Sequence, residues 1–155
     1  MQNFNLYRLF LFLLLNFGAL YIGGLYTSKG VPSEWYLQLN KAPWTPPGWM
    51  FGVAWFTIMV CFSIYLTLLW PQTEQKNTFI TLYILQLFLN ILWNPLFFRF
   101  HYTVAALFTI VGLTILIALY IFRYYKPGGM TLLLAPYFIW LLIASSLNAY
   151  IVFKN

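Results

Sequence analysis

The chain has 155 residues, of which 63% are hydrophobic and only 6% are charged. A soluble domain carries roughly 25% charged residues, so this composition excludes an ordinary soluble domain. The sequence has two Glu, no Asp, one His and one Cys, which excludes a paired-carboxylate site within the apolar segments, an intrachain disulfide and a Cys/His zinc cluster. Its eight Lys and Arg are scattered and form no nucleic-acid-binding patch.

The charged residues divide the chain into long uncharged segments. About 20 apolar residues are enough for a helix to cross a hydrocarbon core of ~30 Å. Continuous apolar runs without polar alternation favour helices over a β-barrel. We therefore expect an all-α, multi-pass integral membrane protein, a five-transmembrane-helix bundle in a single domain over 1–155. The uncharged segments are 9–28, 42–73, 77–98, 100–122 and 127–153.

Sequence signals predict where each helix begins and ends. The first apolar run is too long for a signal peptide and lacks a good cleavage site, so we expect a retained helix. Proline suits the first helical turn, so the second helix is predicted to start at or just after Pro46-Pro47, and Pro71 ends it. The later connectors are short, which predicts antiparallel neighbours. The expected helices are 6–26, 47–70, 78–98, 102–124 and 130–153.

The cations predict no membrane orientation, because they divide equally between the two sides. A simple amino terminus without a transit peptide predicts a bacterial membrane. One side would hold Arg8, Lys76, Arg123 and Lys126, and the other Lys29, Lys41, Arg99 and Lys154.

The connector after the first helix is rich in tryptophan and proline. Residues 35–55 contain four Trp and three Pro in 21 residues. One interpretation is an interfacial aromatic belt, because indole rings favour the headgroup level. The other is a lid over a pocket between helices, since proline lowers the conformational entropy of the loop.

Two later helices carry polar or small residues on one face. Gln86, Asn90 and Asn94 recur every four residues, and Pro95 follows directly. Such amides either hold helices together or line a cavity beside a helix irregularity. On the last helix, Ala144 lies among aromatic residues and leaves room for a neighbouring helix or a ligand. His101 is expected at the interface, with haem ligation as the alternative.

Three segments resemble the translocator protein family, whose members are also called tryptophan-rich sensory proteins or peripheral-type benzodiazepine receptors. The first runs from Trp35 to Trp55, where the family pattern is WYxxLxKPxWxPPxWxFGxxW. The second is LQLFLNILWNPLFF at 85–98, and the third runs from Pro136-Tyr137 through Trp140 and Ala144 to Asn148. The chain departs from the family at Asn94, where Ser is usual, and at Ala149, where the vertebrate cholesterol motif has Tyr. The second departure argues against sterol recognition by this segment.

The resemblance implies a homodimeric bundle whose pocket opens near the first loop and binds porphyrins such as protoporphyrin IX and haem. It also implies light-dependent porphyrin degradation involving Trp55 and Trp140. The alternatives are an uncoupled transporter of porphyrin or sterol, because the helix interiors lack ionisable groups other than tyrosine, and a scaffold that binds nothing. No metal, resident cofactor or nucleic acid is expected. The implied ligand-binding residues are Trp44, Pro47, Trp55, Asn94, Tyr137, Trp140, Ala144 and Leu147.

The chemistry of these residues suits a tetrapyrrole. Trp55 and Trp140 would offer stacking faces to a large flat ring. Asn94 would hydrogen-bond a ligand carbonyl. The carboxylates of the ligand would lie toward the mouth near Lys41 or Arg99, since a charge is costly at the bilayer centre.

Overall fold

The computed structural model describes residues 4–125 and 129–155, and within these ranges it contains helices and no strands. Five helical segments are long and apolar enough to span a membrane, as predicted. The long helices are α1 (Leu6–Gly30), α3 (Gly48–Leu69), α4 (Lys76–Phe98), α5 (Thr103–Arg123) and α6 (Ala135–Lys154). The short elements are α2 (Glu34–Gln38) and the 3-10 segments η1 (Trp70–Gln72) and η2 (Met130–Leu134).

Helix α1 is longer than predicted, because it continues past residue 26 to Gly30. This last residue lies against the ring of Phe98, where a Cβ would come within 2.3 Å of Cδ1. The predicted connector also contains α2, whose first turn is capped by the Ser33 hydroxyl accepting from the Tyr36 amide at 3.3 Å. This short helix was not predicted from the sequence.

The other boundaries differ by smaller amounts. Helix α3 begins at Gly48 with Pro47 as its N-cap, which agrees with the predicted start. Helix α4 begins at Lys76 rather than at residue 78. The last helix was expected from residue 130, but η2 occupies 130–134 and α6 begins at Ala135. The sequence Pro127-Gly128-Gly129, which favours a break before this helix, lies partly outside the described residues; Gly129 is described and precedes η2 with a φ of 82°.

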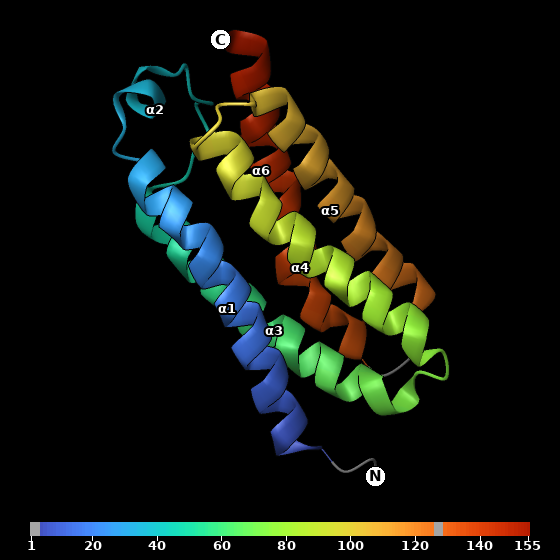
Figure 1. Cartoon of the computed structure of the whole chain (residues 1–155). Helices are drawn as coiled ribbons and strands as arrows, with labels where there is room; N and C mark the ends of the chain where they lie inside the picture. Colours follow the sequence, from blue (N-terminus) through green and yellow to red (C-terminus); the bar gives the residue numbers. More distant parts are fainter. Residues whose placement is uncertain (1–3, 126–128) are drawn as a thin grey trace.

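Helix α1 packs against both α3 and α4, and α5 packs against both α4 and α6 (Figure 1). The bundle is completed by η2, which contacts α3 and leads into α6. The first turn of α1 and the last turn of α6 lie at opposite ends, as an odd number of spans requires. The loop that carries α2 covers the end where α6 finishes.

The half of the bundle away from α2 is solidly packed. Buried aromatic rings fill it, and Phe62 contacts Tyr137 edge to face at 5.4 Å. The Gln86 amide donates to the Tyr137 hydroxyl at 2.8 Å, so this predicted amide holds α4 to α6. The space for a ligand is therefore in the other half, beneath the loop.

Candidate functional site

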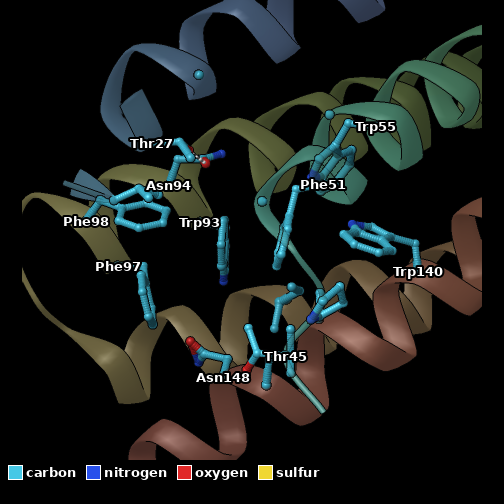
Figure 2. Close-up of a pocket in the computed structure, with 18 of the residues that line it drawn as sticks. Thr27, Thr45, Phe51, Trp55, Trp93, Asn94, Phe97, Phe98, Trp140 and Asn148 are labelled. Carbon is cyan, nitrogen blue, oxygen red and sulfur yellow. Dashed lines mark hydrogen bonds between the residues drawn. The ribbon is translucent and has the colours of Figure 1, made fainter. Parts of the chain in front are cut away.

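A cavity of about 600 Å³ lies between α1, α3, α4 and α6 under the α2 loop. Its volume falls within the range of about 300–1,000 Å³ that is usual for small-molecule sites. The wall is mainly aromatic and aliphatic, and Figure 2 shows rings from α3, α4 and α6 facing the same space. The aromatic lining side chains on these helices are Phe51, Trp55, Trp93, Phe97, Phe98 and Trp140.

Several of the rings contact each other directly. Phe51 meets Trp140 edge to face at 5.1 Å, which joins α3 to α6 across the wall. On the other side, Trp93 and Phe97 stack on consecutive turns of α4 at 5.5 Å with an interplanar angle of 15°. The cavity therefore has flat aromatic surfaces on opposite sides.

Five of the eight residues that the resemblance implied lie in the cavity wall: Trp55, Asn94, Trp140, Ala144 and Leu147. They come from α3, α4 and α6, so the fold brings together residues far apart in the sequence. Their role in binding remains a prediction.

The structure places the other three residues outside the wall. Trp44 is 54% exposed, and its indole N–H donates to the Ser146 hydroxyl at 3.1 Å. Pro47 caps α3. Tyr137 is fully buried behind the wall, with its ring 6.1 Å from that of Trp55. In this structure, Tyr137 supports a wall residue rather than facing the cavity.

Asn94 uses much of its hydrogen-bonding capacity within the protein. Its Oδ1 accepts from the Thr27 hydroxyl at 2.7 Å, and its Nδ2 donates to the Asn90 carbonyl at 3.1 Å (Figure 2). A Cβ on Gly23 would come within 2.5 Å of Nδ2, so a larger residue there would displace the Asn94 side chain. Asn94 thus joins α1 to α4 and keeps one N–H for other partners.

The contribution of α1 to the cavity wall was not predicted from the sequence. Ala19, Leu20, Gly24 and Thr27 all line the cavity. The small residues and the hydroxyl in this apolar run were the available signal, but they are also typical of ordinary helix packing. The sequence pattern alone does not separate a cavity wall from ordinary packing, whereas the hydrogen bond from Thr27 to Asn94 places this face of α1 beside the cavity.

The loop forms the mouth of the cavity. The Lys41 ammonium lies 4.5 Å from the centre of the Tyr36 ring, and both residues line the cavity. Burial raises the pKa of the Tyr36 phenol, which therefore stays neutral at physiological pH. His101 lies outside the wall and stacks on Trp35 at 3.9 Å.

These features define a class of protein: a multi-pass helical membrane protein with an aromatic-walled cavity beneath an extramembrane loop. The family model described as the TspO/MBR family matches residues 10–154, and the chain belongs to this family of membrane sensor and translocator proteins. The chain is therefore an integral membrane protein.

Three relatives illustrate the breadth of the family. The tryptophan-rich protein TspO of Archaeoglobus fulgidus is 36% identical over 140 residues, covering 87% of this chain and 88% of that protein. The tryptophan-rich sensory protein of Cereibacter sphaeroides is 31% identical over 118 residues, which cover 76% of this chain and 74% of that protein. The translocator protein of Bos taurus is 30% identical over 135 residues, which cover 83% of this chain and 78% of that protein.

Proposed function

We propose that this protein is a membrane receptor or sensor that binds porphyrins such as protoporphyrin IX and haem in the cavity beneath the α2 loop. The observation that carries the proposal is the aromatic wall, with rings from α3 and α6 on one side and from α4 on the other. A porphyrin is a large flat aromatic molecule, and stacked or edge-to-face ring contacts contribute about 0.5–1.5 kcal/mol each beyond area burial.

The polar groups of the wall suit a largely apolar ligand. The amide side chains of Asn90 and Asn148 line the cavity, and both residues are at least nine-tenths buried. The Asn148 Nδ2 donates to the Thr103 carbonyl at 3.0 Å, which holds the side chain in place. A mostly apolar wall with a few fixed polar groups is the usual composition of a small-molecule site.

Titration with protoporphyrin IX in detergent, followed by the change in its Soret absorbance, tests the proposal. We expect one saturable site. Replacing Trp55 and Trp140 together with Phe should weaken binding about tenfold, because two large contact surfaces are reduced. Trp49→Phe is the matched control, since Trp49 is 66% exposed and lies outside the wall.

A second variant tests the location of the site. Ala144 lines the cavity beside Trp140, so Ala144→Phe should fill part of the space and abolish saturable binding. The variant must retain its helical circular dichroism for the result to count. Unchanged affinity in both the double tryptophan variant and folded Ala144→Phe would contradict the proposal.

The position of Trp55 and Trp140 also supports light-dependent porphyrin degradation, with dioxygen as the oxidant. Both indoles line the space in which the ring would lie. Illumination of the complex in the presence of dioxygen should give a product whose formation is lost in the double Phe variant under saturating porphyrin. Unchanged turnover in that variant would refute a role for these residues in degradation.

A further inference from the structure

Lys41 is the only charged side chain among the described residues that line the cavity. It lies in the loop that covers the cavity, not within a membrane-spanning helix. The rest of the wall is neutral, so one positive charge faces the loop end of a mainly apolar space. Arg99, the other candidate suggested by the sequence, lies outside the wall with its guanidinium over the Phe100 ring.

The backbone on both sides of Lys41 is held in place. The Asn40 amide N–H donates to the Asn155 Oδ1 at 2.8 Å, and the Asn155 Nδ2 donates back to the Asn40 carbonyl at 3.3 Å. On the other side, Ala42 is 4% exposed, and its carbonyl accepts from the Thr45 hydroxyl at 2.6 Å. Lys41 is therefore presented from a fixed segment, so the backbone loses little further entropy when the side chain binds a ligand.

Lys41 has no ion-pair partner among the acidic side chains. The chain contains only two, Glu34 and Glu74, and in the described part of the protein neither pairs with Lys41. Glu74 lies in the connector between η1 and α4, at the end of the bundle away from the loop. The ammonium instead lies over the Tyr36 ring, and Tyr36 is itself part of the wall. A cation beside an apolar space favours an anionic ligand group, because a charge-assisted hydrogen bond is stronger than a neutral one.

We propose that Lys41 is a specificity-determining residue that binds a carboxylate of the ligand and so selects flat aromatic carboxylic acids over their neutral analogues. This inference rests on the proposed function, since it concerns the same cavity. The acidic edge of the ligand lies at the loop, and the ring extends inward between the aromatic walls. The neutral interior accepts only the uncharged part of the molecule, because burying a second charge there would be costly.

Two probes separate this inference from porphyrin binding in general: protoporphyrin IX and its dimethyl ester, which has the same ring and no free carboxylate. Each is titrated into wild-type protein, Lys41→Gln and Lys41→Arg. We expect Lys41→Gln to weaken binding of the acid about tenfold, the range of one charge-assisted hydrogen bond, and binding of the ester less than twofold. Lys41→Arg should retain most of the affinity for the acid.

Lys29→Gln is the matched control, because Lys29 lies at the same end of the bundle but outside the cavity wall. This variant should change neither the affinity for protoporphyrin IX nor the affinity for its dimethyl ester. Raising the salt concentration should weaken binding of the acid to wild-type protein more than to Lys41→Gln.

The outcomes separate the two proposals. If Lys41→Gln weakens binding of the acid and of the ester equally, or changes neither affinity, Lys41 does not select for carboxylates. The proposal that the protein binds porphyrins then still stands. If wild-type protein binds neither probe saturably, the proposed function and this inference both fail. Retained binding of the ester by Lys41→Gln shows that the variant is folded.

Discussion

At the scale of single residues, two glycines of α1 allow the close approach of α4. Gly23 passes the side chain of Asn94, and Gly30 passes that of Phe98. The two α4 residues line the cavity, so the glycines help to set the position of its wall. Gly18, on the same helix, has open space around the position of a Cβ.

We expect Gly30→Ala to lower the free energy of unfolding by about 1–3 kcal/mol, the usual cost of overpacking. The new Cβ would lie 2.5 Å from the Phe98 Cβ, an atom that moves only if the backbone of α4 moves. Thermal unfolding in detergent, followed by circular dichroism, measures the change. Gly18→Ala is the control and should be neutral or slightly stabilising, because alanine favours the helix. Equal stability of the two variants would show that the contact between α1 and α4 is looser than described.

At the scale of elements, a buried polar cluster joins α1, α3 and α4. The Asn16 Nδ2 donates to the Ser63 hydroxyl at 2.8 Å, and the Tyr83 hydroxyl donates to the Asn16 Oδ1 at 3.0 Å. Asn16 and Ser63 are fully buried. Hydrogen bonds between membrane helices contribute about 0.6 kcal/mol on average and at most about 1.7 kcal/mol. This cluster therefore holds together the half of the bundle on which the cavity rests.

A double-mutant cycle tests this cluster. Asn16→Leu should lower the free energy of unfolding by about 1–2 kcal/mol, because it removes two hydrogen bonds and leaves the Tyr83 hydroxyl buried without its acceptor. Tyr83→Phe should destabilise wild-type protein but should be neutral or stabilising in the Asn16→Leu background. Unfolding in mixed micelles of increasing denaturing detergent provides the measurement. Strictly additive effects would contradict the coupling of these residues.

At the scale of the whole molecule, the number and approximate positions of the long helices could be predicted from the sequence. Charges interrupt the apolar runs, and Pro47 marks the start of α3. The short helix α2 could not be predicted, because five residues are too few for a periodic pattern. The extension of α1 to Gly30 brings that residue against Phe98, and a contact between residues this distant in the sequence has no local signal.

The site was only partly predictable for a related reason. In a membrane protein, apolar side chains face both lipid and protein, so hydrophobicity does not indicate which residues point inward. Motif residues such as Trp55 and Trp140 do line the cavity, whereas Trp44 turns outward to Ser146. Thr27 was missed because its partner Asn94 belongs to another helix.

The central claim is that a porphyrin occupies the cavity beneath the α2 loop. An experimental structure of the purified protein in complex with protoporphyrin IX tests it most directly. We predict that the ring lies between the walls formed by Trp93 and Trp140, with its carboxylate edge at Lys41. A porphyrin bound to the outer apolar surface of the bundle, with the cavity empty, would contradict the claim.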